Sequence, residues 1–321
     1  MLLKAFNKQF LSDISHYTRK AIKDVKSDLW SDLEKDAATK TLGLFPEEIH
    51  PYIQQNLITP LSDPEEEKKT ESKLVSYIQL EVAKLECETN KRGYPDNPYY
   101  LDLFTELEGR VDSMPGVDDF RISFTQLKKY REYIKNMKYL RRWNRINRSV
   151  ETSVMGHTFG VAALALVAAC LEVGRSEETL SKNFIYQSIL RALFHDVPEA
   201  FTGDVISPVK DCIKTKCNWP EIEERRLVPL REATPEKLLN EIDDLKLFSE
   251  LPSGGEDKVG KLVKDCDRLS LLLECVFERS AGGVHGEMEK AYNDYARTVL
   301  CSQWRSIREI ALYGLFKKGE K

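Results

Sequence analysis

Residues 195–210 read HDVPEAFTGDVISPVK, and this stretch opens with a His-Asp pair at the end of a predicted helix. Apolar residues recur at helical spacing before the pair, and Pro198 disfavours helical geometry at the preceding residue, so we expect a helix over residues 184–196. An imidazole beside a carboxylate is a common pair of divalent-metal ligands, although the same dipeptide also occurs as an ordinary surface pair. His195 and Asp196 are therefore candidate metal ligands.

Two acidic residues follow the pair within the same stretch. Glu199 and Asp204 precede Ser207-Pro208, which are residue types typical of a helix N-cap and first helical position. We therefore expect both acidic residues in a short turn that links two helices. They are either exposed loop residues or, beside a bound metal, groups that orient or deprotonate its water.

A further histidine lies upstream, where His157 precedes an alanine-rich apolar run over residues 161–171. The run is too short to cross a membrane, which takes roughly 20 apolar residues, so we expect a buried helix that packs closely against residues 184–196. This packing would bring His157 near His195. A histidine at a helix start also serves as a cap or as a structural residue.

A fourth ligand must come from another segment, and a helix predicted over residues 261–279 contains Asp265 and Asp267. At 100° per residue both aspartates flank one apolar stripe, formed by Val259, Leu262, Val263, Cys266, Leu269 and Leu273. Periodicity alone therefore does not choose between the two carboxylates.

The rest of the chain also shows helical periodicity, with charged amphipathic segments at residues 1–40, 65–89 and 126–141. Alternating apolar and polar positions are scarce, and no βαβ rhythm is present. The sequence therefore predicts an all-α fold, with a helical N-terminal region over residues 1–135 and a second domain over residues 136–321 that carries the chemistry.

Composition narrows the class of protein. The 321 residues carry 48 Lys and Arg against 52 Asp and Glu, a net charge of −4 that gives no general case for nucleic-acid binding. Seven cysteines form no CxxC pair, which favours reduced thiols in a cytoplasmic protein. Residues 1–10 lack the apolar stretch of a signal peptide, so we expect neither export nor membrane attachment.

Taken together, these segments resemble the HD-domain metal-dependent phosphohydrolases, and in particular the 5′-deoxynucleotidase (YfbR-like) branch. That branch carries His-Asp-x-x-Glu, then Thr-Gly-Asp, then Pro-Val-Lys, as residues 195–210 do. Arg142-Trp143 and the segment LVKDCD at residues 262–267 also match, and the resemblance covers roughly residues 138–300. One departure is Gly156, because the branch commonly has an acidic residue directly before the first histidine.

The resemblance implies a function and a set of site residues. It selects Asp267 over Asp265 and implies one divalent ion (Co, Mn, Fe, Ni, Zn or Mg) held by His157, His195, Asp196 and Asp267. It implies that Glu199 and Asp204 are catalytic, that Arg142 binds the substrate phosphate, and that Trp143 abuts the sugar and disfavours a 2′-hydroxyl. It also implies a homodimer.

The leading prediction is therefore a phosphomonoesterase that acts on nucleoside 5′-monophosphates, mainly deoxyribonucleotides. Two alternatives remain open: an HD hydrolase of a triphosphate, cyclic nucleotide or alarmone, and a non-catalytic nucleotide- or metal-binding module. Polyphosphate sites need more positive charge than monophosphate sites. The cations around the motif exclude neither substrate class; they are Arg142, Arg145, Arg148, Arg191 and Lys210.

Overall fold

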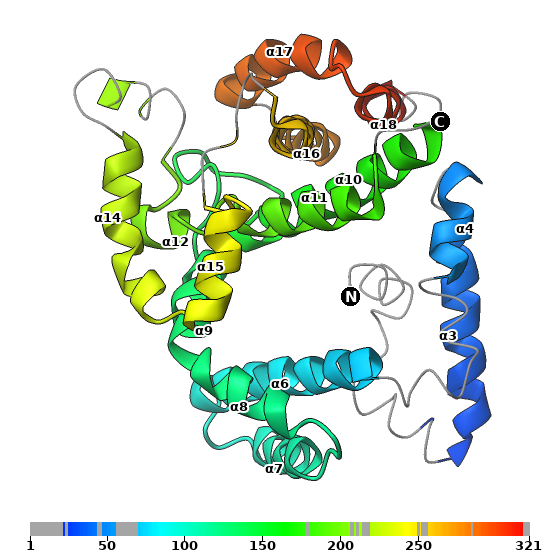
Figure 1. Ribbon diagram of the computed structural model, residues 1–321, viewed down its shortest axis with the longest axis vertical. Helices are drawn as coiled ribbons and strands as arrows, with labels where there is room; N and C mark the ends of the chain where they lie inside the picture. Colours follow the sequence, from blue (N-terminus) through cyan, green and yellow to red (C-terminus); the bar gives the residue numbers. More distant parts are fainter. Residues whose placement is uncertain are drawn as a thin grey trace. The chain divides into compact units, whose positions relative to one another are not determined.

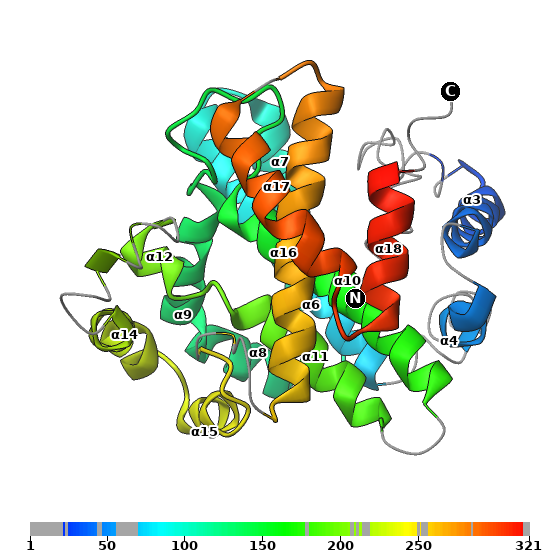
Figure 2. The same cartoon turned by 90° about the horizontal axis from the view of Figure 1, so that it is seen from above.

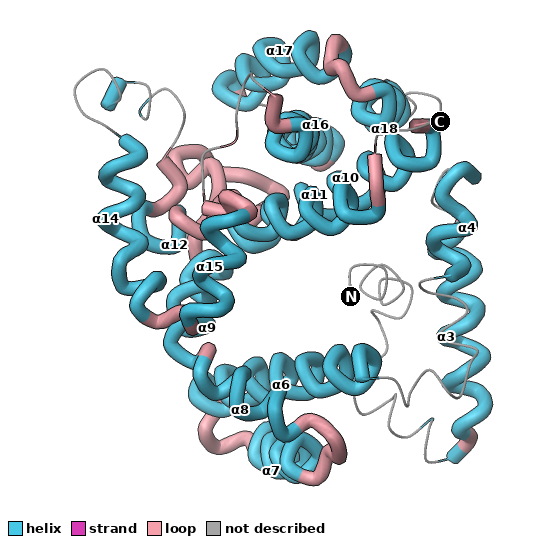
Figure 3. The backbone as a smooth tube through the Cα atoms, viewed as in Figure 1, coloured by secondary structure: helices cyan, strands magenta, loops and turns pink. Residues whose placement is uncertain are grey.

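The computed structural model describes residues 22, 25–43, 47–55, 70–176, 180–205, 209, 212–213, 219–248, 251, 256–283 and 285–316. In these ranges the regular secondary structure is helical, and Figure 3 shows no strand among them. The all-α prediction is confirmed. By its contacts the chain divides into two compact units, residues 1–125 and residues 126–321.

The first unit contains α3 (Ser27–Leu42), α4 (His50–Ile53), α6 (Thr70–Gly93), α7 (Pro98–Asp112) and the greater part of α8 (Asp118–Gln126). Helices α6 and α7 pack against each other, and Tyr77, Val111 and Val117 form a buried cluster. Helix α6 extends to Gly93, four residues beyond the predicted end at residue 89. The predicted start of that helix, at residues 65–69, lies outside the described residues, as does most of the segment predicted at residues 1–40.

The second unit is built around three mutually packed helices: α10 (Val154–Arg175), α11 (Lys182–Phe194) and α16 (Lys258–Ser280). Figures 1 and 2 show α10 and α11 side by side, with α16 crossing them. Among the other described helices of this unit, α17 (Gly286–Leu300) and α18 (Arg305–Phe316) pack against α16. Helices α9 (Lys128–Lys135), α12 (Glu199–Thr202) and α14 (Trp219–Glu232) pack against one another, and α15 (Glu236–Asp244) follows α14 in the chain.

Helix α10 owes its central position to small apolar side chains. Four of its five alanines, at positions 162, 165, 168 and 169, are fully buried, which allows the neighbouring helices to approach closely. By length and composition α10 could cross a membrane, but 67% of its most apolar window is buried inside the protein. A core helix accounts for this composition without a membrane.

The contact-based division lies ten residues before the predicted boundary at residues 135/136. Residues 126–135 fall in the second unit because α9 packs against α12 and α14, and Tyr130 joins a core cluster with Val154 and Leu227.

The predicted helix over residues 126–141 is wrong at its end. Helix α9 stops at Lys135, a 3-10 turn follows over Asn136–Lys138, and Arg141 then pairs with Ser153 in an isolated antiparallel bridge. Two backbone hydrogen bonds reinforce that pairing: the Arg142 N–H donates to the Thr152 carbonyl and the Val154 N–H to the Leu140 carbonyl. Arg142 and Trp143 therefore lie in a loop over residues 141–153, which we name the Arg-Trp loop.

Candidate metal centre

His157 lies in the first turn of α10, at a helix start that Ser153 caps by accepting a hydrogen bond from the Gly156 N–H. The imidazole is buried, with 1% of the residue exposed. Its Nδ1 lies 2.8 Å from Glu274 Oε1, while its Nε2 lies 3.0 Å from Asp267 Oδ1 and 3.8 Å from Asp196 Oδ2. Three carboxylates therefore surround this ring.

His195 and Asp196 come directly after α11, which ends at Phe194, two residues before the predicted end at residue 196. The Ala192 carbonyl can only accept a hydrogen bond, so His195 Nδ1 donates to it at 2.8 Å and Nε2 is left with its lone pair. This Nε2 lies 3.2 Å from Asp196 Oδ2. One ligand atom from each of His157, His195 and Asp196 falls within 4.8 Å of the others, which is close enough for one ion.

The structure separates the two aspartates of α16. Asp267 lies against His157, whereas the Asp265 carboxylate accepts hydrogen bonds from Ser302 Oγ and from Arg268 Nη1. Asp265 therefore links α16 to the start of α18. The geometry brings only Asp267 to the cluster.

The electrostatics of the cluster match a cation site. Burial raises the pKa of Asp196 and of Asp267, but the neighbouring histidines, and Lys264 for Asp267, outweigh it and lower both pKa values below the usual range. Burial and Arg142 lower the pKa of His157, yet hydrogen bonds to Asp267 and Glu274 raise it overall to about 9. The lowered pKa values of the two aspartates and the raised pKa of His157 both indicate a site that favours positive charge.

The donor atoms also fit a divalent ion. Among the described residues, the buried atoms His195 Nε2 and Asp196 Oδ2 have no hydrogen-bond partner, a costly arrangement that a metal would relieve. Two imidazole nitrogens and two carboxylates form a mixed N/O set that suits Mn, Fe, Co, Ni or Zn. His157, His195 and Asp196 can therefore hold one such ion, and the Asp267 carboxylate lies beside them against His157.

Glu274 is the residue of the site that sequence reasoning missed. It is buried, with 6% exposed, and accepts hydrogen bonds from His157 Nδ1 and from Trp143 Nε1, each at 2.8 Å. Burial raises its pKa, but Arg142 and these donors lower the pKa overall to about 2, so Glu274 is a carboxylate that fixes the proton of His157 on Nδ1. Its signal in the sequence is the spacing of seven residues from Asp267, two turns along one helix face.

We expect Glu274→Gln to weaken metal binding about 10- to 100-fold, because residues that orient a ligating histidine have effects of that size. Isothermal titration of the metal-stripped protein measures the change. Glu287→Gln is the matched control, since Glu287 pairs with Arg145 on the surface and lies outside the cluster. Unchanged metal affinity in Glu274→Gln would show that Glu274 does not support a metal ligand.

Arg142 and Trp143 lie beside the cluster in the Arg-Trp loop. Arg142 Nε is 3.3 Å from Glu274 Oε1. Burial lowers the pKa of Arg142, but the surrounding carboxylates raise it overall; they are Glu274, Asp196, Asp204 and Asp267. Trp143 adopts φ +58°, a left-handed conformation that is rare for a bulky side chain. Its hydrogen bond to Glu274 holds the indole in that conformation, and such strain is typical of functional sites.

Glu199 and Asp204 lie in the segment after the His-Asp pair, as expected. Glu199 is buried and begins the single-turn helix α12, where its N–H donates to the Asp196 carbonyl. Gly203 ends that turn at φ +77°, a value that favours glycine, and turns the chain into Asp204. Asp204 is partly buried and its charge reaches Arg142. The predicted Ser207-Pro208 cap lies outside the described residues.

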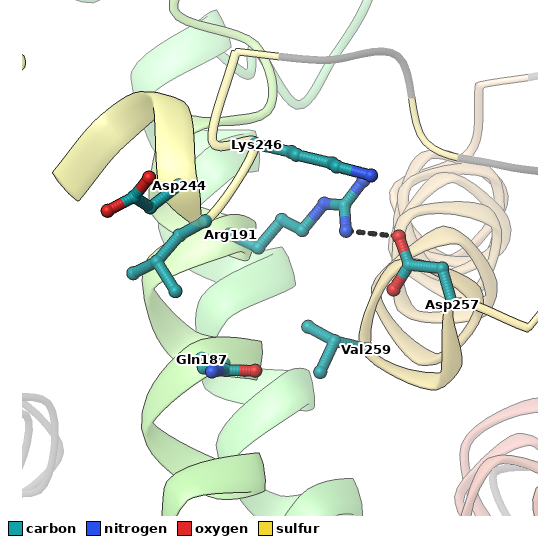
Figure 4. A pocket seen from close by; sticks show the side chains of 7 residues that line it. Gln187, Arg191, Asp244, Lys246, Asp257 and Val259 are labelled. Atoms are coloured by element: carbon teal, nitrogen blue, oxygen red, sulfur yellow. Dashed lines mark hydrogen bonds and ion pairs between the residues drawn. The ribbon is translucent and has the colours of Figure 1, made fainter. Parts of the chain in front are cut away.

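A separate pocket of about 210 Å³ lies between α11, the end of α15 and the start of α16 (Figure 4); it is lined by Gln187, Arg191, Asp244, Leu245, Lys246, Asp257 and Val259. None of these residues belongs to the metal cluster. Arg191, one turn before His195, forms an ion pair with Asp257, which caps α16 by accepting from the Gly260 N–H. This pair fixes the start of α16 against α11, the two helices that carry Asp267 and lead to His195.

Comparisons with known proteins identify the family of the chain. The family model described as 5′-deoxynucleotidase YfbR-like matches residues 129–310. A 5′-deoxynucleotidase of Pectobacterium atrosepticum is 29% identical over 50% of this chain and 77% of its own length; one of Yersinia pestis is 31% identical over 47% and 73%. A solved structure, a conserved hypothetical protein from Pyrococcus furiosus, is 21% identical over 58% of this chain and 97% of its own, with a TM-score of 0.42. The chain belongs to the 5′-deoxynucleotidase YfbR-like family.

Proposed function

We propose that the protein is a divalent-metal-dependent phosphohydrolase that releases phosphate from deoxynucleoside 5′-monophosphates. One observation carries this proposal: His157, His195 and Asp196 bring one ligand atom each to a common point, with Asp267 against His157 and the Arg142 guanidinium beside them. The family and its named relatives support the reaction class.

A divalent ion held by these four residues would lower the pKa of a water molecule and offset negative charge on the phosphoryl group. The protein supplies the rest of the site. His157 donates its Nδ1 proton to Glu274, and His195 donates its Nδ1 proton to the Ala192 carbonyl. The Nε2 atom of each ring therefore keeps its lone pair for a metal ion. We assign to Glu199, buried three residues after Asp196, the acceptance of a proton from the attacking water. The negative charge of Asp204 raises the pKa of Arg142, and we assign to Asp204 the orientation of the guanidinium.

Arg142 has the chemistry required of a phosphate ligand. A guanidinium binds two phosphate oxygens at once, and here its Nε side faces Glu274, which fixes the orientation of the planar group. Trp143 is held beside it by the bond from Nε1 to Glu274, so its ring is available to pack against the sugar. We propose that this ring leaves no room for a 2′-hydroxyl.

The surrounding charges favour a single phosphate over a polyphosphate. Arg145 pairs with Glu287, Arg148 lies 3.6 Å from both Glu274 and Glu278, and Arg191 pairs with Asp257. These three cations therefore already have carboxylate partners within the protein. A triphosphate would have to compete for them.

We expect Arg142→Lys to lower kcat/KM for a deoxynucleoside 5′-monophosphate about 10- to 100-fold, because an ammonium cannot reproduce the planar two-point contact. Steady-state kinetics measure the loss, and thermal unfolding shows whether the fold is intact. Arg145→Lys is the matched control, since Arg145 is exposed and pairs with a surface carboxylate. Unchanged kinetics in Arg142→Lys would remove Arg142 from the substrate site.

Two further expectations concern the setting of the reaction. We propose that the protein acts in the cytoplasm, in line with the buried free thiols of Cys87, Cys170, Cys266 and Cys275. The homodimer stays a prediction, and light scattering of the purified protein measures it.

A further inference from the structure

Two buried carboxylates on one face of α16 contact the Arg-Trp loop over residues 141–153. Glu274 and Glu278 are one helical turn apart, with 6% and 2% of each residue exposed. Glu274 contacts the first part of the loop through Trp143 Nε1 and Arg142 Nε. Glu278 contacts the second part, the returning side, at residues 149–150.

Glu278 binds the backbone of that returning side with both of its oxygens. The Ser149 N–H donates to Oε1 at 2.8 Å and the Val150 N–H donates to Oε2 at 2.9 Å. Arg148 Nε lies 3.6 Å from the same carboxylate, and His285 Nε2 lies 3.4 Å from it. Burial raises the pKa of Glu278, but the two backbone donors and Arg148 lower it overall, so the bound form is the carboxylate.

Gly283 makes room for this carboxylate. A Cβ atom built on Gly283 would lie 2.0 Å from Glu278 Oε1 and 2.7 Å from its Cδ, well inside van der Waals contact. A carboxylate at the end of a side chain can move, whereas the backbone at Gly283 is held by the hydrogen bond from its N–H to the Glu278 carbonyl. An alanine at position 283 would therefore displace the Glu278 carboxylate from the loop without removing it from the chain.

The base of the loop is fixed independently of Glu278. The bridge between Arg141 and Ser153 and the backbone bonds of Arg142 and Val154 close the loop at its two ends. Between these ends the backbone of residues 149–150 depends on Glu278 for its hydrogen bonds. Loss of that anchor would leave the backbone at the two ends in place and free the segment between them. Arg148 in that segment lies 3.6 Å from Glu274, the carboxylate that holds the side chains of Arg142 and Trp143.

We propose that Glu278 is a positioning residue for substrate binding: through Ser149 and Val150 it sets the Arg-Trp loop, and thereby the Arg142 guanidinium and the Trp143 ring, against the metal cluster. This inference rests on the proposed function, because it assigns Arg142 and Trp143 to the phosphate and the sugar. Glu278 is not a metal ligand and does not touch the reacting atoms.

The kinetic test compares Glu278→Gln and Gly283→Ala with the wild type. An amide in place of the carboxylate presents a donor to one of the two backbone N–H groups, so one bond is lost. We expect both variants to lower kcat/KM for a deoxynucleoside 5′-monophosphate about 10- to 100-fold, as displacement of a binding group by about 1 Å does. Metal affinity should change less than about twofold. Glu289→Gln, which breaks the exposed ion pair with Arg279, is the matched control.

A double-mutant cycle distinguishes positioning from a general loss of stability. If Glu278 acts through Arg142, then Glu278→Gln added to Arg142→Lys should cost little beyond Arg142→Lys alone. Fully additive losses would overturn the proposal. So would a lower melting temperature accompanied by unchanged kinetics of the folded enzyme.

Hydrogen exchange provides a measurement that needs no activity. The peptide spanning residues 142–153 should exchange faster in Glu278→Gln and in Gly283→Ala, with α11 unchanged. Unchanged exchange in that peptide would overturn the proposal even where the wild type is active. A wild type that cleaves no monophosphate, with faster loop exchange in the variants, would instead refute the proposed function and leave the anchor established.

Discussion

Asp267→Ala is expected to abolish metal-dependent phosphate release. Asp267 is the one carboxylate that α16 brings to His157 Nε2, and Asp196 approaches the same imidazole nitrogen from the end of α11. Its removal leaves two imidazoles and a single carboxylate for the ion. Because catalysis by this site depends on the bound cation, we expect a loss of at least about three orders of magnitude in kcat.

Asp265→Ala is the matched control on the same helix, two residues away. It removes the hydrogen bonds to Ser302 and Arg268, so we expect lower thermal stability with most of the activity retained. Metal content by mass spectrometry and phosphate release are measured for both variants. An inactive Asp265→Ala beside an active Asp267→Ala would show that the other aspartate serves the metal.

Glu199→Gln should retain the metal and lose about two to four orders of magnitude in kcat, as expected for a general base that can no longer accept a proton. Glu199 begins α12 three residues beyond Asp196. It is buried, whereas an exposed loop residue was the alternative interpretation of the sequence. The amide keeps the size of the side chain, so the packing around α12 is preserved.

Metal content and the kcat of Glu199→Gln are measured together, with Glu221→Gln as the control. Glu221 is an exposed carboxylate that pairs with Arg225 on the next turn of α14, so its loss should leave both quantities unchanged. If Glu199→Gln loses the metal together with the activity, Glu199 is a ligand and the general base lies elsewhere.

The helices that carry the site were predictable because their signals are local. The end of α11 at the His-Asp pair is a consequence of Pro198, and the burial of α10 is a consequence of its alanine-rich composition. The signal that distinguishes Asp265 from Asp267 is not local in the sequence. Both flank the apolar stripe of α16, and what separates them is Ser302, which binds Asp265 from 37 residues away.

The Arg-Trp loop shows what helical periodicity misses. The predicted helix runs to residue 141, yet α9 ends at Lys135, a 3-10 turn follows over Asn136–Lys138, and Arg141 pairs with Ser153. The left-handed conformation of Trp143 is maintained by a bond to Glu274, 131 residues away in the chain. Glu274 and Glu278 interrupt an apolar helix face, and a sequence alone does not show that such acidic residues are buried against a loop.

Phosphate release by metal-stripped and metal-reloaded protein tests the central claim most directly. The substrates are a deoxynucleoside 5′-monophosphate, the matching ribonucleoside 5′-monophosphate, the deoxynucleoside 3′-monophosphate and the deoxynucleoside triphosphate. We predict release that requires added Mn²⁺ or Co²⁺ and that is fastest with the deoxynucleoside 5′-monophosphate. Equal or faster hydrolysis of the triphosphate, or equal activity without metal, would contradict the account.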